Sequence, residues 1–184
     1  MAKPEKYSAE FLAGDRAALE RLYKDTAVLL YRVVFRMTGS REDTEDILHD
    51  VYIRAYEKRK SYRPELSDLR AWLCRIAVNH TLNTLKRRKW LGGNLARIFG
   101  RLSGGQTSDE LDGCLDAETG QDLQKCLQKV PENFRVCLIL RDIEDRTYED
   151  IAALLKLKAG TVKSRINRGR RLLKAMYAKE VRTG

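Results

Sequence analysis

The most informative part of the chain is residues 147–177, which read TYEDIAALLKLKAGTVKSRINRGRRLLKAMY. Thr147 is suited to cap a helix, because Asp150 stands three positions later and can return a hydrogen bond as in a capping box. Apolar residues then recur at the spacing of an inward-facing helical stripe: Ile151, Leu154 and Leu155. A turn over residues 156–160 and a second helix capped by Thr161 are expected to follow.

This second helix has two different faces. Its apolar residues fall on one side: Val162, Ile166, Leu173 and Met176. The other side carries polar and basic residues: Lys163, Ser164, Asn167, Arg168 and Arg171. Arginine and lysine neutralise phosphates or bind guanine edges, asparagine can bond adenine bidentately, and a helix fits the major groove. The pattern predicts a DNA-reading helix-turn-helix, and the alternative is a solvated basic face on an ordinary helical hairpin.

Charge is distributed unevenly along the chain. The 184 residues carry a formal net charge of +10, which favours a polyanionic partner. Basic residues crowd the ranges 54–90 and 160–184, whereas acidic residues crowd the ranges 42–50 and 109–122. This segregation predicts at least two kinds of surface.

The periodicity divides the chain into three parts. No segment shows sustained alternation of period two, so the predicted class is all-α. We expect one helical domain over residues 1–90 and a second, which contains the helix-turn-helix, over residues 121–184. Residues 91–120 are rich in glycine and acidic in their second half, which indicates a flexible linker. The predicted fold is therefore two small helical domains joined by a flexible linker.

Local signals predict the helix boundaries of the first domain. Asp15 and Ser40 are candidate N-caps, and Gly39 ends the helix that precedes Ser40. Asp43 follows Ser40 at the spacing of a capping box, and a third helix is expected to begin near Ser67. The helix after Ser40 has two distinct faces. Its apolar face is formed by Ile47, Val51 and Ala55, and its acidic face is formed by Asp43, Asp46 and Asp50.

The cysteines lack the spacing of a metal site: Cys74, Cys114, Cys126 and Cys137. No close ligand pair occurs and the histidines stand far from the cysteines, so we expect no metal, no cofactor, and reduced thiols that pack as small apolar residues. No apolar run approaches the roughly 20 residues that span a bilayer, and the polar start lacks a signal-peptide core. A cytoplasmic protein without membrane insertion is therefore expected.

Several segments carry further motifs in a fixed order. They are residues 40–56 (SREDTEDILHDVYIRAY), residues 70–79 (RAWLCRIAVN) and residues 131–171, which include GTVKSRINRGRR. They resemble the corresponding segments of bacterial extracytoplasmic function (ECF) sigma factors, over nearly all of the chain outside residues 1–14 and the linker. The family usually has Gly where Lys156 stands and often Pro where Lys158 stands. These departures imply a looser turn or a longer helix, and they add positive charge near DNA.

The resemblance implies a promoter-specificity subunit of RNA polymerase. The first domain would bind core RNA polymerase and recognise the minus-10 element, and the second would read the minus-35 element of promoter DNA. The polymerase surface would include Asp43, Asp46 and Asp50. The alternative for these acids is compensation of the helix dipole, worth under about 1 kcal/mol each, but Asp50 stands too far along the helix for that. The minus-35 contacts would come from Lys163, Ser164, Asn167, Arg168 and Arg171.

The implied minus-10 residues lie in the loop 58–69 and in the helix that follows: Tyr62, Arg63, Asn79, Lys86, Arg87 and Arg88. They would capture one unstacked base, whose extraction costs a few kcal/mol that stacking and hydrogen bonds offset. Tyr62 is the aromatic residue placed to stack, whereas Trp72 is better explained as core. Asn79 could equally bond the loop backbone. The run 86–89 either follows the phosphate backbone or is a solvated helix end.

Two other classes of function fit the sequence less well. A stand-alone helix-turn-helix repressor or activator would explain the C-terminal domain but would leave the acidic face and the basic first domain unused. An enzyme is disfavoured, because the sequence has no phosphate-binding glycine loop followed by lysine and no plausible pair of nucleophile and base. The resemblance also implies an anti-sigma partner and a linker whose acidic residues 109–118 thread through the polymerase. Solubilising disorder explains the same linker composition.

Overall fold

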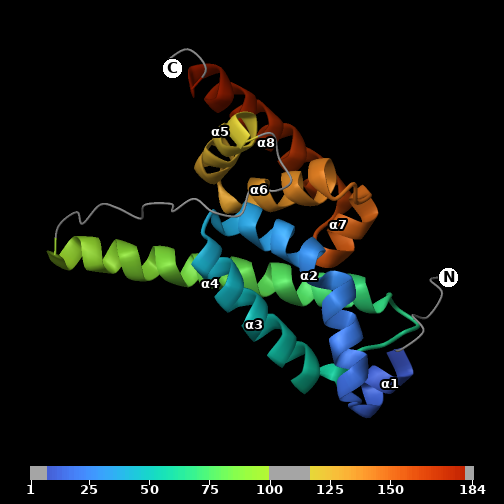
Figure 1. The fold of residues 1–184 in the computed structure, drawn as a ribbon. Coiled ribbons are helices and arrows are strands. Elements are labelled where there is room, and N and C mark those ends of the chain that lie inside the picture. The colour runs from blue at the N-terminus through green and yellow to red at the C-terminus, as the bar shows by residue number, and fades with distance from the viewer. Residues whose placement is uncertain (1–7, 100–116, 181–184) are drawn as a thin grey trace.

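A computed structural model describes residues 8–99 and 117–180 of the chain (Figure 1). The N-terminal half consists of α1 (Ser8–Ala13), α2 (Arg16–Thr38), α3 (Arg41–Glu57), the 3-10 turn η1 (Arg59–Ser61) and α4 (Leu69–Phe99). The C-terminal half consists of α5 (Ala117–Lys129), α6 (Glu132–Leu138), the π-helical turn η2 (Ile139–Ile143), α7 (Tyr148–Leu155) and α8 (Ala159–Glu180). These residues contain helices and no strand, which confirms the all-α prediction.

The predicted caps of α2 and α3 are confirmed. The Asp15 carboxylate accepts a hydrogen bond from the Ala17 amide at 2.8 Å, and the Ser40 hydroxyl accepts one from the Asp43 amide at 3.2 Å. Between the two helices, Gly39 adopts φ 73° and its amide donates to the Phe35 carbonyl. This left-handed conformation ends α2 and is one that glycine adopts without steric cost.

The core of the N-terminal half lies where α2, α3 and α4 meet. Its fully buried residues come from all three helices: Leu22, Leu30, Val33, Val51, Leu69 and Leu73. Trp72 is 5% exposed, and its ring contacts Phe11 of α1 and Tyr62 at centroid distances of 6.2 and 5.5 Å. The interpretation of Trp72 as a core residue is therefore confirmed.

Helix α4 begins at Leu69, close to its predicted start near Ser67, but it ends later than predicted. The Asp68 carboxylate accepts a hydrogen bond from the Ala71 amide at 2.6 Å and caps the first turn. The helix continues to Phe99, past the predicted domain boundary at residue 90, and it extends well beyond the other helices in Figure 1. Gly92 and Gly93 each cost about 1 kcal/mol in a helix, which is too little to end it. Residues 100–116 of the predicted linker lie outside the described residues.

In the C-terminal half, α5, α6 and α7 pack against α8. Buried residues of this half include Leu127, Val136, Ile139, Leu140, Ile151, Val162 and Ile166. At Gly169 of α8, a Cβ atom would lie 2.9 Å from the Leu138 Cγ, so only glycine allows α6 and α8 to approach this closely.

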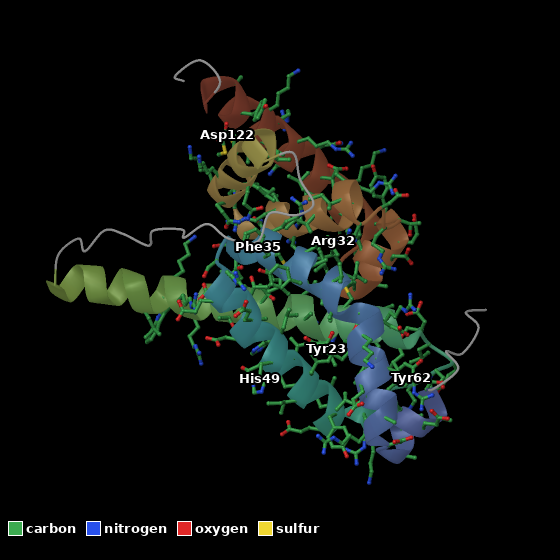
Figure 2. The ribbon with its side chains drawn as sticks, in the orientation of Figure 1. Tyr23, Arg32, Phe35, His49, Tyr62 and Asp122 are labelled. Carbon is green, nitrogen blue, oxygen red and sulfur yellow. The ribbon has the colours of Figure 1, made fainter. Side chains whose placement is uncertain are left out.

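The two halves meet at the C-terminal end of α2, which lies between α3–α4 and the C-terminal helices in Figure 1. The last carbonyls of a helix lack partners within the helix. Here side chains of the C-terminal half supply donors: Arg135 bonds the Met37 carbonyl at 2.5 Å, and Gln128 bonds the Arg36 carbonyl at 2.9 Å. Gln124 also donates to the Phe35 carbonyl, and Arg32 pairs with Glu144 at 3.6 Å (Figure 2).

Within the part of the chain that the structure describes, no helix is both long and apolar enough to cross a membrane.

Candidate nucleic-acid and protein interfaces

Helices α7 and α8 form the predicted helix-turn-helix. The Thr147 hydroxyl accepts from the Asp150 amide at 3.1 Å, and the Asp150 carboxylate accepts from the Thr147 amide at 3.4 Å. Both bonds of the capping box are thus present. After α7, Lys156 adopts the left-handed conformation with φ 54° and ends the helix.

The start of the second helix was predicted wrongly. Helix α8 begins at Ala159. Its first hydrogen bonds are donated to the Lys158 carbonyl by the amides of Thr161, at 2.9 Å, and Val162, at 3.1 Å. Thr161 therefore lies inside the first turn and does not cap the helix. The turn is shorter than predicted because Ala159 and Gly160 are already helical.

The two faces of α8 are as predicted. Val162 and Ile166 are fully buried, and the opposite face exposes all five of the predicted minus-35 residues: Lys163, Ser164, Asn167, Arg168 and Arg171. The Ser164 hydroxyl donates to the Thr161 carbonyl at 2.9 Å, so part of its bonding capacity is used locally. Sequence reasoning missed Lys174, which is also exposed and extends the row formed by Lys163, Asn167 and Arg171.

One exposed arginine of α8 is tied to a neighbouring element. Arg170 makes two hydrogen bonds to the Asp142 carboxylate, at 3.1 and 2.5 Å, and thereby ties α8 to η2. This hydrogen bonding raises the pKa of the Arg170 guanidinium. Sequence reasoning missed this pair because its members stand far apart in the chain.

The acidic face of α3 is only partly available to a partner. The Asp43 carboxylate accepts a hydrogen bond from Arg88, and the Asp50 carboxylate pairs with His80 at 3.1 Å. The bond to Asp43 raises the pKa of the Arg88 guanidinium. Of the three predicted polymerase contacts, only Asp46 has no side-chain hydrogen bond or ion pair with another described residue.

The outermost ridge of α3 is a different set from the predicted one. Its exposed residues recur every three or four positions: Glu42, Asp46, His49, Ile53 and Glu57. Ile53 is 45% exposed, so the ridge combines carboxylates with an apolar side chain. A signal was available in the sequence, because these positions lie opposite Val51 and Ala55 on the helix.

The predicted stacking role of Tyr62 is contradicted by its position (Figure 2). Tyr62 is 1% exposed, its ring packs on Trp72, and its hydroxyl donates to the Ser67 carbonyl at 3.1 Å. The ring therefore belongs to the core and holds the loop 58–69 in place. Arg63, by contrast, is exposed, and its guanidinium donates to the Lys60 carbonyl at 2.9 Å.

The remaining minus-10 residues lie on α4. Asn79, Lys86 and Arg87 are exposed, and none of them bonds to another residue in the described ranges. The alternative that Asn79 bonds the loop backbone therefore finds no support. Arg88 is half-exposed and donates to the Asp43 carboxylate, so its positive charge is partly offset within the fold.

Three of the four cysteines are buried, as predicted: Cys74, Cys126 and Cys137. Burial raises the pKa of the Cys74 thiol to about 11 and also raises the pKa of Cys137, so both thiols stay protonated at neutral pH. Cys114 lies outside the described residues. Across residues 8–99 and 117–180, no three potential metal ligands come together.

Comparisons with known protein families agree with this division into two halves. Residues 22–91 match sigma-70 region 2, and residues 120–173 match sigma-70 region 4. The first match covers most of α2 to α4, and the second covers most of α5 to α8.

Individual relatives extend the similarity over most of the chain. The chain is 35% identical to the ECF RNA polymerase sigma factor SigE of Mycolicibacterium smegmatis over 90% of its own length and 65% of that protein. It is 30% identical to the ECF sigma factor SigW of Bacillus subtilis over 83% of both chains. The fold is similar to that of the sigma factor RpoE of Bartonella quintana in its complex with the anti-sigma factor NepR, with a TM-score of 0.69 and 25% identity over 85% of this chain and 94% of that one. The chain therefore belongs to the ECF family of RNA polymerase sigma factors.

Proposed function

We propose that this chain binds core RNA polymerase, directs it to promoters and starts transcription there, with no catalysis of its own. One observation carries the proposal: two helical halves, matched to sigma-70 regions 2 and 4, each present a row of unpaired polar and basic side chains. In this proposal residues 1–90 and 121–184 are the functional domains, residues 91–120 connect them, and the protein acts in the cytoplasm.

The C-terminal half would read the minus-35 element through α8. Its outward row consists of Lys163, Asn167 and Arg171. Two contacts hold the helix in place: the hydrogen bonds from Arg170 to Asp142 of η2, and the close packing of α6 at Gly169. A rigid helix with free amide and cationic groups suits base-edge and phosphate contacts in the major groove.

The N-terminal half would read the minus-10 element through the loop 58–69 and α4. The exposed Arg63, Asn79, Lys86 and Arg87 supply cations and an amide, whereas the buried Tyr62 shapes the loop from inside. Unpaired bases can be bound by such groups once they leave the duplex stack.

The polymerase contact would be the ridge of α3 centred on Asp46. Carboxylates interspersed with an exposed isoleucine form a mixed polar and apolar surface, as protein interfaces do. Since Asp43 and Asp50 are engaged with α4, they would contribute less than Asp46. An anti-sigma factor is a further expected partner, because the related RpoE is bound by one.

In vitro transcription with purified core polymerase, followed by mapping of transcript starts, tests this proposal. We expect the chain to confer initiation at a fixed distance from a shared pair of promoter elements. The competing role, a stand-alone repressor or activator, predicts tight binding of the free protein to a palindromic operator and no gain in initiation with core polymerase.

A further inference from the structure

The contact between the two halves combines apolar packing with polar and charged side chains. Buried apolar residues of both halves form one continuous cluster, which favours the closed arrangement. Gln128 and Arg135 donate hydrogen bonds to carbonyls at the end of α2, at 2.9 and 2.5 Å. The Glu144 carboxylate lies 3.6 Å from the Arg32 guanidinium, and its side chain is 5% exposed. We call these four side chains the latch: Arg32, Gln128, Arg135 and Glu144.

Two charged groups inside the contact oppose it. Arg36 is 9% exposed, and burial lowers the pKa of its guanidinium. The Arg36 Nε and the Glu144 Oε1 atoms are both buried and have no hydrogen-bond partner among the described residues. Leaving a buried polar atom unsatisfied is costly, and both atoms would be hydrated if the halves parted. The closed arrangement therefore rests on a balance of opposing effects, as expected for domain contacts that open and close.

The closed arrangement brings the two proposed DNA surfaces together in one body (Figure 1). A compact chain of this length is about 40 Å across. The minus-10 and minus-35 elements lie about 25 base pairs apart by their positions, which is about 85 Å at roughly 3.4 Å per base pair. The closed chain is therefore too short to bind both elements at once on straight DNA.

We propose that the latch is an autoinhibitory contact, which holds the free chain closed and has to open before both promoter elements are bound. This proposal rests on the proposed function and adds to it a regulatory step within the chain itself. When the binding-competent state is only partly populated, apparent affinity falls by that fraction. A weaker latch should thus improve binding to a promoter with both elements. It should leave binding to an isolated minus-35 duplex unchanged, because the outward residues of α8 are already exposed in the closed chain.

The Cys74 thiol can report the opening. It lies on α4, is 2% exposed, and has its pKa raised to about 11 by burial. Among the charges that act on this thiol, those of Arg146 and Glu144 belong to the C-terminal half. Parting of the halves should expose Cys74, whereas Cys137 should stay buried inside the C-terminal half. Alkylation with iodoacetamide, resolved by peptide mass spectrometry, measures the two thiols separately.

A charge reversal on α2 has a matched control on the same helix. Arg32→Glu places a second carboxylate beside Glu144 and is expected to raise the rate of Cys74 alkylation about fivefold or more. Arg16→Glu reverses an exposed arginine that pairs with Glu20 within α2, so its rate should stay within about twofold of wild type. Cys137 alkylation should stay unchanged in both chains, and an equal rise at Cys137 would indicate unfolding and contradict a latch.

The same variants test autoinhibition directly. With core polymerase, the Arg32→Glu chain is expected to bind a promoter with both elements about threefold or more tightly than wild type. Without polymerase, both variants should bind the isolated minus-35 duplex as wild type does. Gln128→Ala removes a hydrogen bond to the end of α2 and should act in the same direction as Arg32→Glu.

A reversible cross-link can fix the closed arrangement. The Lys89 Nζ lies 4.0 Å from the Glu132 Oε1, so this pair joins α4 to α6 across the contact. Lys89→Cys and Glu132→Cys are combined with Cys114→Ser in the full chain and joined by a short reducible thiol cross-linker. The linked chain should bind the isolated minus-35 duplex but fail to initiate with core polymerase at a promoter with both elements. Reduction should restore initiation to the level of the same chain before linking.

Three outcomes would overturn the proposal: full initiation by the linked chain, Cys74 alkylation in Arg32→Glu that is no faster than in Arg16→Glu, or promoter binding by Arg32→Glu that is no tighter than in wild type. Failure of the unmodified chain to initiate would instead refute the proposed function. Alkylation of the free chain would still measure the latch in that case, so the two failures are distinguishable.

Discussion

The two helices that we propose to face DNA, α4 and α8, carry positive charge in different ways. On α8 the outward cations Lys163, Arg168 and Arg171 have no partner among the described residues, and the paired Arg170 points toward η2. On α4, Arg88 bonds to Asp43 of the neighbouring helix, and Lys89 lies 4.0 Å from Glu132. A count of cations along the sequence therefore agrees with the unpaired cations of α8 and overstates those of α4.

The largest expected effect concerns Arg135. This residue belongs to the C-terminal half but donates to the Met37 carbonyl at the end of α2, in the N-terminal half. Arg135→Leu would leave the carbonyls of Met37, Gln128 and Val130 without their guanidinium donor. We expect a loss of about 3 kcal/mol in the free energy of unfolding, because hydrogen bonds to charged groups contribute roughly 1.5–3 kcal/mol each. Urea denaturation followed by circular dichroism measures this loss.

The exposed Arg171→Leu serves as the control, with a change within about 0.5 kcal/mol. Equal stability of the two variants would show that the halves do not depend on each other through Arg135.

The next prediction concerns how α8 recognises the minus-35 sequence. Asn167→Ala and Lys163→Ala are expected to cost roughly 1–3 kcal/mol on the preferred minus-35 sequence and to flatten discrimination between sequences. Arg171→Ala should weaken binding to every sequence alike and lower the salt slope by about one. Binding across a set of minus-35 variants separates these cases, and unchanged preference in both of the first two variants would show that base readout lies elsewhere.

A smaller effect tests the difference between paired and unpaired acids on α3. Asp46→Lys should weaken association with core polymerase several-fold and leave thermal stability nearly unchanged, because exposed charges contribute little to folding. Asp43→Asn should instead leave polymerase binding nearly intact and cost under about 1 kcal/mol of stability through loss of the Arg88 pair. A quantitative pull-down with core polymerase that ranks the two variants in the opposite order would contradict the assignment.

The smallest effect compares two helix ends. Gly39 and Lys156 both end a helix in the left-handed conformation, at φ 73° and 54°, but only one of them is glycine. Lys156→Gly is expected to raise the free energy of unfolding by less than about 1 kcal/mol, since relief of the Cβ clash outweighs the extra flexibility of the unfolded chain. Thermal denaturation detects this gain, and a lower melting temperature would show that the lysine side chain contributes a contact of its own.

Sequence patterns predicted the features that depend on near neighbours along the chain. The caps at Asp15, Ser40 and Thr147 and the two faces of α8 follow from residues within one or two helical turns of each other. The same reasoning failed at Thr161, where two neighbouring residues already had helical conformation.

What the sequence did not show depends on contacts between distant segments. The family resemblance implied that Tyr62 stacks on a base, but its ring is buried and packs on Trp72 of α4. Asp43 and Arg88 each fit an exposed position on their own helix, and only the packing of α3 against α4 joins them. Periodicity within one helix cannot report which residue of another helix stands opposite.

The donors supplied to the end of α2 also have a kinetic consequence. The amides of the last turn of α2 exchange their hydrogens with solvent only when that turn opens, and the turn is held by Gln128 and Arg135 from the other half. Separation of the halves would release the Arg36 and Met37 carbonyls to water and allow the turn to fray. Hydrogen exchange near Gly39 would then report how often the two halves part.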